Sequence, residues 1–531
     1  MIPIHRTKYL LRISLSLLAL PLFLVGCREQ PREKEKSQEQ KAEMQQLSTI
    51  EQAILLDAES PFHLDLGAYG KIDPELAIGV FDSGTGGLTV LDALVRFDGN
   101  DNASGAEGAD GIHDFAREKF IYLADQANMP YGNYHSEDKT DLLKEHIIKD
   151  VHFLLSDRYY SANDQGVQKN DKQKIKAVVV ACNTATAYGM QEIEAFMART
   201  DLDIPVIGVI DAGARGVLRE FKKDEDGAIG VFATVGTIAS QGYENTILGQ
   251  KEALGHSGDI QIYNQGGHGV AEAIDGEPDF IDRTATSARD NYRGPSLDNG
   301  PHPIDQTLMD VYNFDFDHGK MLCDASDNGD CGVLQINDTE NYIRYHLVSL
   351  MEKIRKAENP QPLKALVLGC THYPYMSETI KKVFGELYAY KGDSQEYVYR
   401  DHMAPEIKII DPAVFVAKEL YDVLQEKELL NDSADMMAES EFYISVPNLQ
   451  NENTALDQIG KFTYDYKYGR EAGNIQEYVK RVPFNRDNIP AEMLQRLENS
   501  IPTTYGMIVE FNKGNPKMGD LAQDKQIKAS L

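Results

Sequence analysis

Residues 177–187 read AVVVACNTATA, and residues 365–374 read ALVLGCTHYP. In each stretch an apolar run leads to a cysteine, Cys182 or Cys370, and small hydroxyl-bearing residues follow. A continuous apolar run bounded by polar residues is typical of a buried central strand in a parallel sheet. Ligands of such sheets gather beyond the carboxyl ends of the strands. Both thiols are therefore expected where a ligand binds.

Similar apolar runs recur along the chain, with helical patterns between most of them. This alternation predicts an α/β fold with mainly parallel sheets flanked by helices. One run leads into the glycine-rich turn DSGTGG (82–87), which offers backbone N–H groups to an anion or serves only as a tight turn. The runs are ELAIGVF (75–81), KFIYLAD (119–125), IPVIGVID (204–211), GAIGVFAT (227–234) and IKIIDP (407–412).

The composition fits a large, acidic, globular protein. The chain has 531 residues, of which 42% are hydrophobic and 26% charged, enough for two or more domains. Lys and Arg total 53 against 84 Asp and Glu, which gives a net charge of -31. This balance excludes the basic face that nucleic acid requires, so no nucleic-acid partner is expected.

The N-terminus has the features of an export signal. Arg6, Lys8 and Arg12 precede an apolar stretch that is short for a bilayer span, and the stretch ends in LVGC (24–27). This ending resembles the lipobox of bacterial lipoproteins. We therefore expect a signal peptide at residues 1–26 and a lipidated Cys27, and hence an exported, membrane-anchored protein on the periplasmic or cell-surface side. An uncleaved signal anchor is the alternative.

A charged tether is expected at residues 27–73, before a globular part that starts near Pro74. Residues 28–46 are almost devoid of apolar side chains and cannot offset the entropy of ordering by burial. A partly helical stalk is the alternative.

Several stretches together carry a resemblance to a known family. They are IGVFDSGTGGLTVL (78–91), YLADQANMPYG (122–132), VVVACNTATA (178–187), IPVIGVIDAGA (204–214), VFATVGTIAS (231–240) and LVLGCTHYP (366–374). In order and content they resemble glutamate racemase, of the aspartate/glutamate racemase superfamily. The resemblance implies two pseudo-symmetric α/β domains, an active site in the cleft between them, and no cofactor. The first domain would hold residues 76–205 plus 408–531, and the second residues 206–407.

The family chemistry explains why two thiols are needed. Inverting an α-carbon requires removal of a proton from one face and delivery of a proton to the other. A cysteine has an ordinary pKa of about 8.5, which its surroundings can bring toward the working pH. The resemblance implies that Cys182 takes the proton from the D isomer and Cys370 from the L isomer. A buried structural cysteine is the alternative for each.

The resemblance also implies the residues that support the thiols. Asp82 would act beside Cys182, and His372 beside Cys370. Asp82 as a turn cap and His372 as a metal ligand are the alternatives, but no Cys/His spacing completes a metal site. Substrate binding would involve Ser83, Pro130, Tyr131, Gly132, Asn183, Thr184, Thr234 and Thr371, some of which could equally cap helices.

One departure from the family lies in IQIYNQGGHGVAEAIDG (260–276). Gly267 and His268 stand where the family usually has Cys-Pro. Without gaps, Asp275 falls on the acidic partner of the second histidine, and Glu272 is the competing candidate. This change leaves the identity of the substrate open.

A second departure is an insertion at about residues 277–340. Within it, Cys323 and Cys331 bracket DASDNGD, and an exported protein favours a disulfide between them. The same loop resembles a calcium loop, but Gln335 stands where a bidentate glutamate belongs, so a solvated turn is the alternative. The calcium-loop candidates are Asp324, Ser326, Asn328, Gly329 and Asp330.

The expected function is that of a cofactor-independent amino-acid racemase, most of all one that converts L-glutamate to D-glutamate for peptidoglycan precursors. Export conflicts with the cytoplasmic supply of D-glutamate, and an oxidising compartment threatens the thiols. The alternatives are a surface lipoprotein that binds amino acids without turnover, and a racemase for another acidic amino acid such as aspartate. A homodimer is one of the oligomeric states left open.

Overall fold

The computed structural model describes residues 47–163, 166–324, 331–432 and 436–529. Cys27 and the expected signal peptide lie outside these residues. Thr49–Leu531 form one compact unit. Within the described ranges, no helix combines the length and the apolar character needed to cross a bilayer.

The first sheet has six strands in the order β14-β13-β2-β1-β5-β6. All neighbours are parallel except β13 and β14. The central strands are fully buried, as their continuous apolar runs predict. The bounds are β1 Ala77–Asp82, β2 Phe120–Ala124, β5 Ile175–Val180, β6 Val206–Gly208, β13 Glu441–Pro447 and β14 Val479–Pro483.

The second sheet has four parallel strands in the order β12-β11-β7-β8. Their bounds are β7 Gly227–Ala233, β8 Ile260–Gly266, β11 Leu363–Gly369 and β12 Met403–Ile410. Both sheets are mainly parallel and flanked by helices, so the predicted α/β class is confirmed. We call the part of the chain around the first sheet the first lobe, and the part around the second sheet the second lobe.

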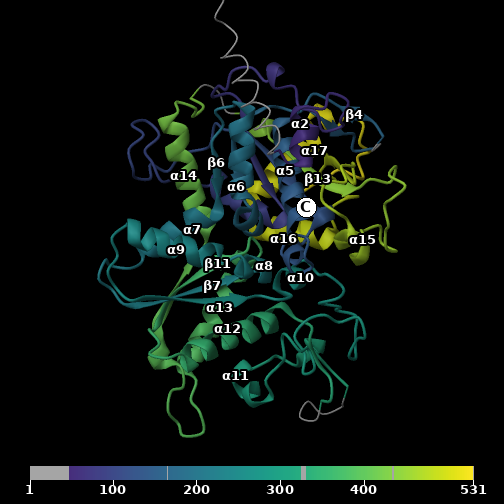
Figure 1. The fold of residues 1–531 in the computed structure, drawn as a ribbon. Coiled ribbons are helices and arrows are strands. Elements are labelled where there is room, and N and C mark those ends of the chain that lie inside the picture. The colour runs from purple at the N-terminus through teal and green to yellow at the C-terminus, as the bar shows by residue number, and fades with distance from the viewer. Residues whose placement is uncertain (1–46, 164–165, 325–330, 433–435, 530–531) are drawn as a thin grey trace, which may run out of the picture. The chain divides into compact units, whose positions relative to one another are not determined.

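Helices cover both faces of each sheet (Figure 1). On the first sheet, α5 (Thr140–Leu155) and α6 (Asn183–Thr200) cover one face, and α3 (Leu88–Val95) and α17 (Pro502–Gly514) pack on the other. On the second, α12 (Thr339–Lys356) and α13 (Ser377–Ala389) cover one face. Two helices, α7 (Val209–Arg219) and α14 (Pro412–Glu426), pack against each other and against β11.

One apolar cluster joins the two lobes. It includes Val80 and Val179 of the first sheet together with Val231 and Val367 of the second. Such a shared core stabilises both sheets through the same buried apolar surface. The lobes are therefore not independently packed.

The compact part begins earlier than the expected start near Pro74. Helix α2 (Thr49–Leu55) buries Ile50, Ala53 and Ile54, and it packs on α5. Phe62 and Leu64 join the same apolar cluster. The boundary was misplaced because three apolar residues at helical spacing within a polar stretch form a weak pattern until their partner helix is known.

The C-terminal residues extend the first lobe. Strands β13 and β14 add to the sheet beside β2, and α16 (Ala491–Ser500) and α17 follow them. In Figure 1 these yellow-green and yellow elements lie among the purple and blue elements of the early chain. A segment that lies outside the stretches carrying the family resemblance is thus part of the central architecture.

The insertion at 277–340 contains α11 (Met309–Tyr312) and a hairpin of β9 (Met321–Cys323) and β10 (Leu334–Ile336). The disulfide between Cys323 and Cys331 is present, which confirms that prediction. The calcium-loop candidates Ser326, Asn328, Gly329 and Asp330 lie outside the described residues.

Candidate active site

Cys182 lies where β5 ends and α6 begins. Its Sγ accepts a hydrogen bond from the N–H of Ala185 at 3.4 Å and lies 3.7 Å from Ser83 Oγ. Burial raises the pKa of the Cys182 thiol, and the charge of Asp82 adds to the rise, while the N–H of Ala185 opposes it. Burial and the nearby carboxylate therefore both favour the neutral thiol over the thiolate.

Asp82 ends β1, the strand beside β5, and links this thiol to the other lobe. Its Oδ2 accepts from the N–H of Gly87 at 2.7 Å and from the hydroxyl of Thr371 at 3.4 Å. Its Oδ1 is buried and has no hydrogen-bond partner among the described residues. Burial raises the pKa of Asp82, against the effects of the His372 charge and the Gly87 N–H. A carboxylate oxygen without a hydrogen-bond partner, close to a thiol, can accept a hydrogen bond from the ammonium group of a substrate.

Cys370 lies at the corresponding point of the second sheet, directly after β11. Its Sγ is 3.7 Å from His372 Nδ1, and His372 Nε2 is 3.1 Å from Asp275 Oδ2. Burial alone would lower the pKa of His372, but the Asp275 carboxylate and the Cys370 sulfur together outweigh burial and hold that pKa well above its ordinary value. The imidazole can therefore remain protonated beside the thiol.

Asp275 directly follows α10 (Val270–Ile274) and, of the two acidic candidates, is the one that contacts His372. Burial alone would raise the pKa of Asp275, but His372 and Arg496 together lower it. Glu272 lies nearby, and burial raises its pKa to about 7.

Arg496, on α16, is a residue that sequence reasoning missed. Its Nη2 donates to Asp275 Oδ1 at 2.6 Å, and its Nη1 donates to the carbonyl of Ile274. The sequence AEMLQRLENS gives no signal for this contact, because it reads as an ordinary amphipathic helix and its partner lies 221 residues away.

Hydroxyl groups from both lobes meet near the first thiol. Thr184 Oγ1 lies 3.2 Å from Thr234 Oγ1 and 3.0 Å from Thr237 Oγ1. Asn183 Oδ1 accepts from the hydroxyl of Tyr243 at 2.5 Å. Ser83, Asn183, Thr184, Thr234 and Thr371 are therefore brought together at the junction of the lobes.

The segment 130–132 reaches the same junction mainly through its backbone. The hydroxyl oxygen of Tyr131 lies 2.6 Å from Asp125 Oδ2 and 2.6 Å from Asp150 Oδ2, and its single proton is donated to one of these two carboxyl groups at a time. That side chain is committed to a buried acidic pair, which leaves only the backbone of Tyr131 to meet a substrate. Pro130 follows a cis peptide bond, and a Cβ atom on Gly236 would lie 2.4 Å from the carbonyl oxygen of Gly132.

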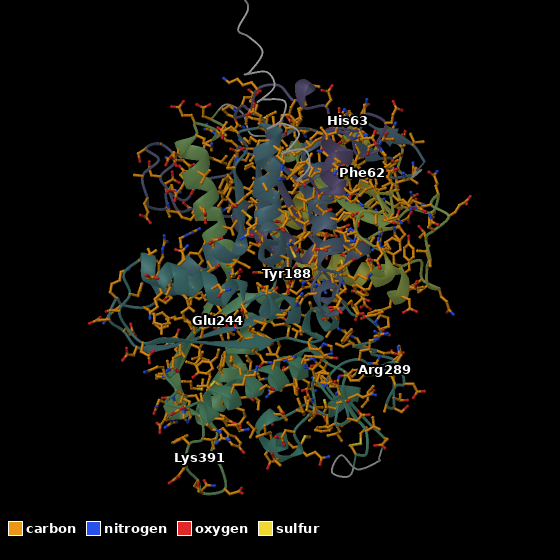
Figure 2. All side chains as sticks on the ribbon, in the orientation of Figure 1. Phe62, His63, Tyr188, Glu244, Arg289 and Lys391 are labelled. Atoms are coloured by element: carbon orange, nitrogen blue, oxygen red, sulfur yellow. A yellow bond between two sulfur atoms is a disulfide. The ribbon has the colours of Figure 1, made fainter. Side chains whose placement is uncertain are left out.

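The contacts between lobes continue along α6. Figure 2 labels Tyr188 on this helix, and its hydroxyl donates to the carbonyl of Gly236 in α8 (Val235–Ala239) at 2.9 Å.

Within the second lobe, the labelled Glu244 lies on α9 (Gly242–Ala253) and accepts a hydrogen bond from Asn264 at 2.6 Å.

The altered segment after β8 has a packing reason. A Cβ atom on Gly267 would lie 2.2 Å from the hydroxyl oxygen of Tyr373 and 2.9 Å from Phe232. Any larger residue, cysteine included, would displace Tyr373 from behind the second thiol. His268 instead turns toward the insertion, with Nε2 2.7 Å from the carbonyl of Arg293.

Both cysteines are free thiols, and each is 5% exposed. A substrate of amino-acid size therefore requires some separation of the lobes to reach them. Among the described residues, no cluster of three or more His, Cys, Asp and Glu side chains is arranged to hold a metal ion.

Comparison with known proteins finds relatives of this chain, although no family model matches it. The glutamate racemase of Oceanobacillus iheyensis is 26% identical over 367 residues, which cover 69% of this chain and 85% of that enzyme. The chain is a homologue of the glutamate racemases. The Enterococcus faecalis glutamate racemase is 36% identical over a shorter stretch, 32% of this chain and 46% of the enzyme.

Solved glutamate racemases also align with the chain. The Bacillus anthracis enzyme covers 70% of this chain and 87% of its own at 24% identity, with a TM-score of 0.39. The Francisella tularensis enzyme, solved in complex with D-glutamate, covers 75% and 95% at 21% identity, with a TM-score of 0.38.

Proposed function

We propose that the protein is a cofactor-independent amino-acid racemase that interconverts L- and D-glutamate, with Cys182 and Cys370 as its two bases. The observation that supports this most is the pair of buried free thiols, each at the end of a central strand and each with its own charged partner. Relatives named glutamate racemase support glutamate as the substrate.

In the proposed reaction, one thiolate removes the α-proton from one face of the substrate, and the opposite thiol donates a proton to the other face. The C–H bond that breaks is replaced by a new C–H bond, so protons balance and no redox partner is needed. A substrate ammonium beside Asp82 would favour the thiolate of Cys182, because an opposite charge stabilises the ionised form. His372, whose Nδ1 lies 3.7 Å from the sulfur of Cys370, would be the charged partner of that thiol.

A second candidate is a protein that binds acidic amino acids in this cleft without turnover, or that racemises aspartate. The observation in its favour is the altered segment at Gly267 and His268 beside the second thiol. Measuring whether the protein turns over amino acids separates the binding protein from the enzyme, and measuring which amino acid it prefers separates a glutamate racemase from an aspartate racemase.

The test uses a chain lacking residues 1–46, kept reduced and incubated with L-glutamate, L-aspartate and other L-amino acids, with chiral chromatography as the readout. We expect D-glutamate to form fastest. Cys182→Ala and Cys370→Ala should each lower the rate by about 10²–10⁴-fold, the usual size of general acid–base catalysis. Cys323→Ser/Cys331→Ser is the control that removes two cysteines outside the site.

The outcomes are distinct. Binding of glutamate without inversion would favour the binding protein over the enzyme. A Cys182→Ala or Cys370→Ala protein that racemises at the parental rate would contradict the two-base assignment.

We also propose that Cys27 anchors the protein to a membrane outside the cytoplasm. This proposal rests on the sequence of residues 1–27. Metabolic labelling with a palmitate analogue should mark the parental protein and not Cys27→Ala. Equal labelling of both would contradict the anchor.

A further inference from the structure

An arginine from the C-terminal region is the last of a series of side chains in contact that starts at the second thiol. Cys370, His372, Asp275 and Arg496 follow one another through contacts of 3.7, 3.1 and 2.6 Å. The Asp275 side chain is 1% exposed and the Arg496 side chain 21% exposed. Charged hydrogen bonds with little access to water are the strong ones, because the surroundings screen them weakly.

The two oxygens of Asp275 have separate partners. Oδ2 faces His372 Nε2, and Oδ1 accepts from Arg496 Nη2, while Arg496 Nη1 reaches the carbonyl of Ile274 next to it. The planar guanidinium thus donates hydrogen bonds both to the side chain of Asp275 and to the backbone carbonyl of the preceding residue. This double contact fixes the rotation of the carboxylate and therefore the direction in which it holds the imidazole.

Arg496 is itself held by the first lobe. On the same helix α16, Met493 Sδ accepts from the hydroxyl of Thr85 in the glycine-rich turn at 3.0 Å. On α17, Thr504 Oγ1 donates to Asp92 Oδ1 of α3 at 3.0 Å. The helix that carries Arg496 is therefore anchored beside the turn that follows β1, whereas Asp275 belongs to the second lobe.

We propose that Arg496 is a positioning residue that orients Asp275 and His372 for proton transfer at Cys370, so that the C-terminal region is part of the racemase site. The proposal rests on the racemase function proposed above. Loss of Arg496 would leave Asp275 Oδ1 buried without its donor and free the carboxylate to rotate.

The test compares Arg496→Met, which keeps the aliphatic part of the side chain but removes the guanidinium group, with Arg496→Lys, which keeps the positive charge. Arg486→Met is the matched control, because Arg486 lies in the same C-terminal region and is exposed. We expect Arg496→Met to lower kcat/KM by about 10- to 100-fold, as removal of an outer-shell partner does elsewhere. Arg496→Lys should recover part of the loss, and the control should match the parent.

Two readouts separate positioning from mere support of the fold. Because two enantiomers have equal free energies, kcat/KM must fall equally in both directions, but primary isotope effects need not change equally. With α-deuterated substrates, the isotope effect should rise in Arg496→Met only for the enantiomer that Cys370 deprotonates. A downfield imidazole N–H resonance from the His372–Asp275 hydrogen bond should be present in the parent and control, lost in Arg496→Met and restored in Arg496→Lys.

Parental kcat/KM, isotope effects and N–H resonance in Arg496→Met would overturn the proposal. So would a loss of activity that merely matches a loss of folded protein, measured by thermal unfolding. If the parent racemises no amino acid, the proposed function fails, and the N–H resonance still decides whether Arg496 orients the pair.

Discussion

Gly86 lies directly against the imidazole of His372. A Cβ atom on Gly86 would be 2.6 Å from both His372 Cε1 and Thr371 Oγ1, closer than packed atoms approach. The glycine of the first lobe therefore permits the second thiol's histidine to approach the Asp82 loop.

This approach predicts that Gly86→Ala lowers kcat/KM by about 10²-fold, the scale of an ångström-sized misplacement at a reacting centre. Gly385→Ala is the control, because Gly385 lies in α13 with nothing within 4 Å of a built Cβ atom. Steady-state kinetics of the two folded variants provides the measurement. Parental kinetics in Gly86→Ala would show that the two loops do not meet during turnover.

Glu272 gives the site a titration near neutral pH. Burial raises its pKa from 4.5 to about 7, so it is neutral in mild acid and becomes a carboxylate near His372 above that pH. An acid whose pKa is raised by folding binds its proton more tightly in the folded state, so its contribution to stability falls as pH rises from 4.5 to about 7.

We therefore expect Glu272→Gln to be more stable, relative to the parent, at pH 8 than at pH 5, and to lose an inflection near pH 7 in the parental rate profile. Thermal unfolding at both pH values and a pH series of kcat/KM measure this. A constant difference in stability between the two proteins at both pH values would contradict the raised pKa.

At the residue scale, local sequence was informative where a strand leads directly into the site. Cys182, Asp82, Cys370 and His372 all lie at or just after the ends of buried strands, and the structure brings them to one junction. Arg496 could not be found this way, because its role depends on a contact with a distant turn. For Tyr131 the sequence predicted a place at the site but not the role of its side chain. Nothing in the local sequence shows that its hydroxyl contacts Asp125 and Asp150.

At the element scale, the insertion and the C-terminal region meet beyond the second thiol. Lys461 Nζ lies 2.9 Å from Glu277 Oε1, and the guanidinium of Arg293 lies over the ring of Tyr464 at 4.5 Å. Both contacts join residues of the insertion to the segment around α15 (Tyr464–Gly469). Partly exposed pairs of this kind contribute modestly to stability but restrict how the two segments move.

The disulfide acts on the insertion alone. It closes a short loop, with a sequence separation of 8 residues, next to the hairpin of β9 and β10. Cys323→Ser should lower the free energy of unfolding of the insertion by about 2.5 kcal/mol, the loop-entropy value for such a loop. Faster proteolysis of residues 277–340 with unchanged racemisation is the expected result. Activity lost together with the disulfide would show that the insertion shapes the site.

The strands were predictable because central strands of parallel sheets are apolar on both faces, a pattern that a single sequence displays. Their neighbours were harder to predict. FYISVPN (442–448) reads as a strand, but nothing local assigns it to the edge of β2, where β13 pairs. Pairing of this kind depends on contacts between distant segments, as does the packing of α2 on α5.

At the scale of the whole molecule, the two sheets share one core and present their strand ends to one site. Because the thiols are 5% exposed, the substrate must enter by a movement that parts Thr184 from Thr234 and Thr371 from Asp82. Each of these is a neutral or charge-assisted hydrogen bond, with a net contribution of about 0.5–3 kcal/mol. The expected division between the two domains, at residues 205/206 and 407/408, and the oligomeric state stay predictions.

The central claim is that two opposed thiols invert the α-carbon, and proton exchange in D₂O tests it most directly. The reduced protein is incubated with L-glutamate, and α-deuterium is measured in both enantiomers at early times by chiral separation and mass spectrometry. We predict that the D-glutamate formed is almost wholly deuterated while the remaining L-glutamate is not. Deuterium appearing equally in both enantiomers from the start, or no exchange in a protein that binds glutamate, would contradict the account.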